Sequence, residues 1–100
     1  MSLPTILRPA ARREFDEASN WYENRKSGLG FAFVKAVRDI LLSISANPVA
    51  HAVVHSDVRE ALVPGYPYAV YYREEPTYFS VLAIFHTSRD PTIWQSRASS

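Results

Sequence analysis

The sequence has no cysteine among its 100 residues, so disulfide bonds and thiolate metal sites are excluded. It also lacks an apolar run of about 18 residues, the length that a helix needs to cross a bilayer. The opening segment, MSLPTILRPAARREF, turns polar too soon for a secretory leader. We therefore expect a cytoplasmic protein with no membrane partner.

Net charge is also nearly absent, at +1, and does not by itself indicate a nucleic-acid binder. Residues 1–50 hold seven Lys and Arg against five acids, whereas residues 51–100 hold four against five. The positive charge thus favours the half that contains the predicted helices, the reverse of what a phosphate-binding sheet would show. A chain of 100 residues with 47% hydrophobic residues predicts one globular domain over residues 1–100.

Motifs for common cofactors are missing as well. No GxGxxG, P-loop or GxSxG segment occurs, so we expect neither a nucleotide cofactor nor a serine-hydrolase nucleophile. His51 and His55 stand four residues apart, but their segment has no helical period and no third ligand accompanies them. We therefore predict no metal site and no cofactor.

Two helices are predicted over residues 9–46. Apolar residues at spacings of three and four give each helix one buried face: Ala11, Phe15, Ala18 and Tyr22 in the first, and Phe33, Val37, Ile40, Leu41 and Ile44 in the second. Pro9 suits a first helical turn, Gly28 suits a left-handed break, and Asn47-Pro48 ends the second helix. Because the break between the two helices is short, we predict that they form a hairpin. The apolar faces of this hairpin need a sheet to cover them.

Strands are predicted on both sides of this hairpin. Leu3–Arg8 is a short opening strand, and Val58–Arg97 contains three runs of β-branched and aromatic residues. The turns between these runs are Pro64-Gly65 and Glu74-Glu75-Pro76. Residues 49–57 show neither the helical spacing of apolar residues nor the alternation of a strand, and we interpret them as a loop with a brief strand.

The last run is apolar on both faces, which places it at the centre of the sheet. Strict alternation puts Phe79, Val81, Ala83 and Phe85 on one face and Tyr78, Ser80, Leu82, Ile84 and His86 on the other. Asp90-Pro91 then predicts a short C-terminal helix, and residues 98–100 a frayed tail. The predicted fold is α+β, with an antiparallel sheet of about four strands packed against the N-terminal hairpin.

The order of these elements, together with specific motifs, resembles the RelE/ParE toxin superfamily of bacterial toxin-antitoxin modules. The matching pieces are Trp21-Tyr22-Glu23, Gly28-Leu29-Gly30-Phe31, Asn47-Pro48, Val58-Arg59, the strand from Tyr66 to Tyr72, and His86-Thr87-Ser88-Arg89-Asp90-Pro91 with Trp94 and Arg97. The pattern is most similar to the ParE-like, plasmid-stabilisation branch. The resemblance implies a growth-inhibiting toxin, a cognate antitoxin, and a target that is either DNA gyrase or ribosome-bound mRNA.

RNA cleavage needs a base, an acid and positive charge around the dianionic phosphorane. The resemblance implies that mRNA-cleaving members use a basic cluster on the sheet and a tyrosine near the C-terminus. Arg59 and Arg89 keep two basic positions, but Ala61 and Ala69 replace others and Trp94 stands near the place of the tyrosine. We therefore favour a ParE-like inhibitor that binds a target such as DNA gyrase. The alternatives are a RelE-like, metal-independent mRNA endonuclease and a non-toxic structural relative.

Three residues are the catalytic candidates if the chain is an enzyme. Arg59 and Arg89 supply positive charge, and His86 supplies a group that titrates near neutrality. The structural alternatives are a solvated Arg59, a hydrogen-bonded strand-end His86, and an ion pair of Arg89 with Asp90 or Glu60.

Six further residues are candidates for binding the target or a partner. Trp94 and Arg97 combine the residue types that interfaces favour, although large aromatics also fill cores. The cations Arg12, Arg13, Lys35 and Arg38 lie on the predicted helices, where they are either solvated or receive an acidic antitoxin segment.

Overall fold

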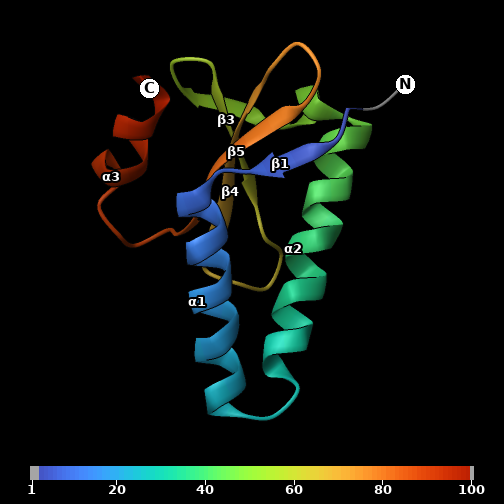
Figure 1. Cartoon of the computed structure of the whole chain (residues 1–100), viewed down its shortest axis with the longest axis vertical. Coiled ribbons are helices and arrows are strands. Elements are labelled where there is room, and N and C mark those ends of the chain that lie inside the picture. Colours follow the sequence, from blue (N-terminus) through green and yellow to red (C-terminus); the bar gives the residue numbers. More distant parts are fainter. Residues whose placement is uncertain (1–2, 100) are drawn as a thin grey trace.

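The computed structural model describes residues 3–99 of the chain (Figure 1). Its elements, in order, are β1 (Thr5–Leu7), α1 (Pro9–Arg25), α2 (Leu29–Ala46), a 3-10 turn (Pro48–Ala50), β2 (Ala52–His55), β3 (Val58–Leu62), β4 (Tyr68–Glu74), β5 (Phe79–His86), α3 (Thr92–Gln95) and a second 3-10 turn (Ser96–Ser99). In Figure 1 the α1–α2 hairpin extends well past the sheet, and its connecting loop lies far from both termini. No helix within residues 3–99 is long and apolar enough to span a membrane.

The hairpin has the predicted bounds, and glycine and glutamate fix its turn. Gly28 has φ +94°, a conformation that favours glycine. A Cβ on Gly30 would lie 2.8 Å from the Ser19 carbonyl oxygen, so the two helices meet where one lacks a side chain. The Glu23 carboxylate accepts hydrogen bonds from the backbone N–H groups of Gly28 and Gly30, both at 3.0 Å. These contacts satisfy donors at the start of α2 that have no partner within the helix.

The sheet has five strands in the order β1-β5-β4-β3-β2 and is mixed. The predicted antiparallel meander is present, and β5 is an interior strand that pairs on both sides. The parallel pairing of β1 with β5 differs from the prediction of an antiparallel sheet. The brief strand expected within residues 49–57 is β2, an edge strand with exposed residues and a register shift, and it brings the sheet to five strands instead of about four. The parallel pairing depends on long-range topology, which alternation along a strand does not encode.

A bulge in β5 overturns the predicted alternation. Tyr71 pairs with Ala83 but Tyr72 pairs with Val81, so Leu82 is one extra residue on β5. Beyond it the faces exchange, and Ile84 packs in the hairpin-side core instead of the opposite one. His86, two residues later, is turned to the hairpin side with it. The bulge therefore aims the end of β5 at α1.

Each face of the sheet carries its own core. The hairpin side is the larger and is built around buried Phe15, Phe33, Ile44, Val70, Tyr72 and Val81. The opposite side holds Val58, Ala69, Tyr71, Leu82, Ala83, Phe85 and Trp94 and lies under the C-terminal segment. The predicted frayed tail is wrong for residues 98 and 99, because the Ala98 carbonyl accepts a hydrogen bond from Arg73 at 2.6 Å. Residue 100 lies outside the described residues.

Candidate functional site

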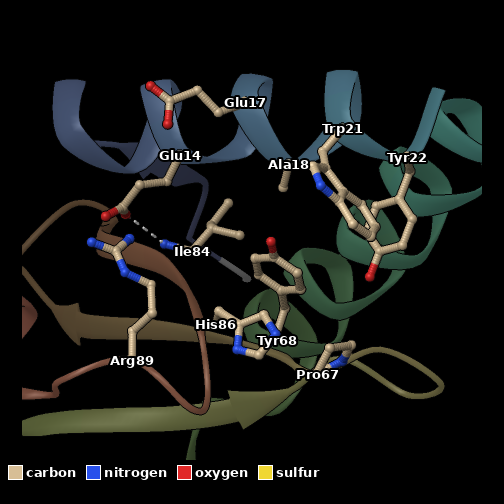
Figure 2. A pocket seen from close by; sticks show the side chains of 10 residues that line it. All are labelled: Glu14, Glu17, Ala18, Trp21, Tyr22, Pro67, Tyr68, Ile84, His86 and Arg89. Atoms are coloured by element: carbon tan, nitrogen blue, oxygen red, sulfur yellow. Dashed lines mark hydrogen bonds between the residues drawn. The ribbon is translucent and has the colours of Figure 1, made fainter. Parts of the chain in front are cut away.

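A pocket of about 440 Å³ opens between α1 and the ends of β4 and β5 (Figure 2). We call it the α1 pocket. Its lining residues are Glu14, Glu17, Ala18, Trp21, Tyr22, Pro67, Tyr68, Ile84, His86 and Arg89. In Figure 2, Trp21 and Tyr22 come down from α1 while the Tyr68 hydroxyl points up towards that helix. The pocket joins an aromatic side to a charged side.

The β5 bulge and the β4–β5 register bring the pocket floor together. His86 pairs with Tyr68 across the strands, and their rings meet edge to face with centroids 5.2 Å apart. Burial raises the pKa of Tyr68, so its hydroxyl stays protonated at neutral pH. The floor therefore presents a neutral hydroxyl beside an imidazole.

The hydrogen bonds of His86 fix its tautomer. The backbone N–H of Ser88 donates to Nδ1 at 3.1 Å, so Nδ1 acts as an acceptor and the ring proton is on Nε2. The Ser88 hydroxyl lies 2.8 Å from the same nitrogen. In this arrangement Nδ1 is engaged by Ser88, as the structural alternative for a strand-end histidine expects. A catalytic role for His86 stays a prediction.

The charges around the pocket are unevenly compensated. Glu14 forms an ion pair with Arg97 at 2.9 Å and also accepts the Ile84 backbone N–H at 3.2 Å. Glu17, at the pocket rim, has no ion pair among the residues that the structure describes. The Arg89 guanidinium lies 4.6 Å from the centroid of the Phe85 ring. One cation and two carboxylates therefore border the pocket.

The ion pair considered for Arg89 is not formed. The Asp90 carboxylate instead accepts the backbone N–H and the hydroxyl of Thr92, and these bonds lower the pKa of Asp90. Glu60 accepts the Tyr71 hydroxyl at 2.7 Å. Arg89, which is exposed, instead lies over the Phe85 ring, and its charge partly opposes the effect of burial on the pKa of Tyr68.

Arg59 does not join His86 and Arg89. It lines a separate pocket of about 260 Å³ with Tyr72 and Glu74, and its Nη1 donates to the His51 carbonyl at 2.6 Å. Along β4, Arg59 pairs at Tyr72 whereas His86 pairs at Tyr68. The structure thus brings together two of the three catalytic candidates and separates the third.

The C-terminal candidates are used within the chain. Trp94 is only 3% exposed and stacks on Tyr71 with ring centroids 4.0 Å apart. Trp94 therefore packs in a core of this structure, and its contact with a partner stays a prediction. Arg97 pairs with Glu14 and donates to the Leu82 carbonyl at 3.1 Å, so it attaches the C-terminal segment to α1 and β5.

The helix cations lie on the outside of the hairpin. Arg12 and Arg38 line a groove of about 330 Å³ between α1 and α2, together with Phe15, Asp16, Ser19, Asn20 and Val34. Exposed ion pairs join Arg12 to Asp16 at 3.5 Å and Lys35 to Asp39 at 3.2 Å. Arg13 is exposed on α1. All four cations are accessible to a partner.

Comparison with known proteins places this fold and its motifs in a family. Residues 5–91 match the family described as "ParE toxin of type II toxin-antitoxin system, parDE". The chain belongs to the ParE toxin family. Among solved structures, a chain of "Chromosomal ParDE TA system from P. aeruginosa" superposes with a TM-score of 0.63 at 18% sequence identity, covering 85% of this chain and 96% of that one. No curated protein sequence matches significantly. The predicted RelE/ParE membership and α+β fold are confirmed.

Several pocket residues of this ParE-family toxin were not singled out by their sequence. Glu14 gives no local signal, because its partner Arg97 lies 83 positions away. Trp21 and Tyr68 stand within the family motifs, and that position was the available clue. No group of three or more potential metal ligands occurs within residues 3–99. The ParE-family pocket therefore offers aromatic faces and single charges for binding.

Proposed function

We propose that this ParE-family toxin inhibits growth in the cytoplasm by binding a macromolecular target such as DNA gyrase, and that a cognate antitoxin neutralises it. The observation that carries the proposal is the dispersal of the candidate catalytic cations. Of the two candidate arginines, Arg59 lines another pocket and only Arg89 lines the α1 pocket. A binding role needs no such cluster.

Electrostatics at the α1 pocket oppose the alternative of RNA cleavage. A phosphorane intermediate needs several donors and positive charges preorganised around it. The pocket lining instead has one cation, Arg89, beside the carboxylate residues Glu14 and Glu17, and Nδ1 of His86 already accepts the Ser88 backbone N–H. These features support a protein-binding toxin over a ribosome-dependent nuclease.

The pocket composition suits recognition of a protein. Trp, Tyr and Arg dominate the residues that contribute most to binding energy at interfaces. Trp21, Tyr68 and Arg89 present these three side-chain types around one opening. Arg89 is the one arginine or lysine in the lining of this pocket, and it has no ion pair among the described residues.

The antitoxin has a separate place to dock on the outer hairpin groove. An amphipathic segment with acidic residues would bury apolar side chains near Val34 and set its carboxylates against Arg12 and Arg38, which line the groove. Arg13 and Lys35 are exposed on the same two helices and add positive charge nearby. The existing pairs with Asp16 and Asp39 are exposed, so exchanging them costs little. Charge complementarity of this kind mainly raises association rates and specificity.

Two assays on the purified chain test the proposal. We expect inhibition of gyrase supercoiling and no cleavage of ribosome-bound mRNA. The opposite result would identify a RelE-like nuclease, and failure of induced expression to slow growth would identify a non-toxic relative.

Two arginine variants sharpen this test. Arg89→Ala should abolish growth inhibition with the fold intact, because the substituted side chain is exposed and unpaired within residues 3–99. Arg13→Ala, also exposed but away from the α1 pocket, should keep growth inhibition and weaken antitoxin binding. Identical behaviour of the two variants would contradict the division into target and antitoxin surfaces.

A further inference from the structure

The end of the hairpin exposes large apolar side chains that no other element covers. We define the hairpin tip as residues 21–31, which Figure 1 places at the extremity of the molecule beyond the sheet. Phe31 is 75% exposed and Trp21 is 52% exposed, although both belong to types that are usually buried when a core is within reach. Leu29, also within residues 21–31, is 38% exposed. Their position excludes burial in either core of this chain.

The charge left available at the hairpin tip is positive. The Glu23 carboxylate is occupied by the backbone N–H groups of Gly28 and Gly30 at 3.0 Å. Arg25 and Lys26 are exposed, and neither forms an ion pair with another described residue. The Arg25 guanidinium lies 4.3 Å from the Trp21 ring centroid, a cation–π pair already formed at the surface.

The hairpin tip is also preorganised. Gly28 takes its left-handed conformation between two hydrogen-bonded helix ends, and the close approach of Gly30 to Ser19 locks the helices together. A surface that is ordered before binding loses less conformational entropy when a partner arrives. Exposed aromatic rings on a rigid support are typical of interface anchors.

We propose that the hairpin tip inserts into the protein that this toxin inhibits, at an apolar socket rimmed by carboxylates. This inference rests on the proposed function and adds a second contact surface to it. The socket takes Phe31 and the Trp21 ring, while its carboxylates receive Arg25 and Lys26. Trp21 also lines the α1 pocket, so the tip and the pocket form one continuous contact surface.

The same charges argue against other partners. Proteins that hold duplex DNA by its phosphates commonly make about 6–10 such contacts, and basic clusters that recognise anionic membranes contain about 4–8 Lys or Arg. The tip supplies two cations, Arg25 and Lys26. Two cations beside exposed rings suit the desolvated, mixed apolar and charged contacts of a protein interface.

The experiment compares Phe31→Ala and Arg25→Ala with a control in α2, the helix of Phe31: Leu42→Ala removes an apolar side chain that is 69% exposed. Affinity for purified DNA gyrase, growth inhibition, antitoxin binding and thermal melting are measured for each variant. We expect Phe31→Ala and Arg25→Ala to weaken gyrase binding by about tenfold or more, with unchanged melting and antitoxin binding. Leu42→Ala should match the wild type, and Arg25→Lys should recover part of the loss by keeping the charge.

Wild-type gyrase binding by the Phe31→Ala variant would overturn the inference and leave the proposed function standing. The inference would also be overturned, with the proposed function left standing, if the substitutions at the hairpin tip weakened binding only to duplex DNA or to phosphatidylglycerol vesicles. If the wild-type chain neither binds gyrase nor slows growth, the proposed function fails and the tip proposal falls with it.

Discussion

The two faces of the sheet are closed by different means. On the hairpin side, large rings pack on one another: Tyr22 stacks on Phe33 at 5.1 Å, and Tyr66 meets Phe33 at 5.2 Å. On the other side, a helix of four residues covers a smaller core that is centred on Trp94 and Tyr71. Burial of apolar side chains holds the hairpin on the first face. The C-terminal segment on the second face needs further contacts to stay in place.

Arginines provide that attachment. Arg8 donates to the Arg97 carbonyl at 3.0 Å, Arg73 donates to the Ala98 carbonyl at 2.6 Å, and Arg97 pairs with Glu14. A segment this short has little apolar area to bury, so polar contacts carry a larger share of its docking. Three cations are thereby committed to structure.

The largest expected effect lies on the hairpin side. Phe33→Ala removes a fully buried ring from the centre of the aromatic cluster and should lower the free energy of unfolding by about 3–5 kcal/mol. Urea unfolding followed by circular dichroism measures it. Phe31→Ala, two positions earlier in the same helix but exposed, should change the free energy of unfolding by less than about 0.5 kcal/mol. Equal losses in both variants would show that the hairpin face is not closed by burial.

We expect a smaller loss of stability when the main polar contact on the C-terminal face, that of Arg97, is removed. Arg97→Ala leaves Glu14 without its partner in a partly buried place, and we expect a loss of about 2–3 kcal/mol of unfolding free energy. Near-ultraviolet circular dichroism should change because Trp94 is the buried tryptophan under this segment. The double variant Glu14→Gln/Arg97→Ala should lose less than the sum of the two single changes. Strict additivity would mean that the pair does not attach the segment.

The sequence predicts the hairpin well because its signals are local. Pro9, Gly28 and Asn47-Pro48 delimit two amphipathic patterns. The helix α1 begins at Pro9 and ends at Arg25, three residues before Gly28, and α2 runs from the residue after Gly28 to the residue before Asn47. The pairing of β1 with β5 and the extra residue Leu82 are not local, since each depends on a strand distant in sequence. The bulge then exchanged the faces assigned to Ile84 and His86.

The candidate site was partly predictable for the same reason. His86 and Arg89 are three positions apart in one motif, and the structure places both in the α1 pocket. Exposure is not encoded by residue type, so Trp94 was expected at an interface but stacks on Tyr71 in a core. Whether these positions contact a target stays a prediction.

The next largest loss of stability is expected on removal of the Tyr71 hydroxyl, on the C-terminal side of the sheet. Burial raises the pKa of Tyr71, and its hydrogen bond to Glu60 raises it further. Because this pKa lies above its unfolded value of 10.0, the stabilisation is fully present below pH 10 and is lost as the pH rises further. Tyr71→Phe should cost about 1 kcal/mol of unfolding free energy at pH 7 and reduce the additional loss at alkaline pH. Melting temperatures between pH 7 and 11 measure both, and an unchanged alkaline slope would assign that loss to other tyrosines.

The smallest effect concerns the contact that orients Arg73 towards the C-terminal segment. A hydrogen bond from Arg73 lowers the pKa of Asp57, so its stabilisation is present above the unfolded value of 3.8 and is lost as the pH falls through the lower folded value. Asp57 is largely exposed, and solvent screening limits the contribution to less than about 1 kcal/mol. Asp57→Asn should therefore lower the melting temperature slightly at pH 7, and the difference from wild type should vanish near pH 2. If the difference in melting temperature persists in acid, the charge of Asp57 does not cause it. The hydrogen bond from Arg73 to the Ala98 carbonyl would then hold the Arg73 side chain in place without Asp57.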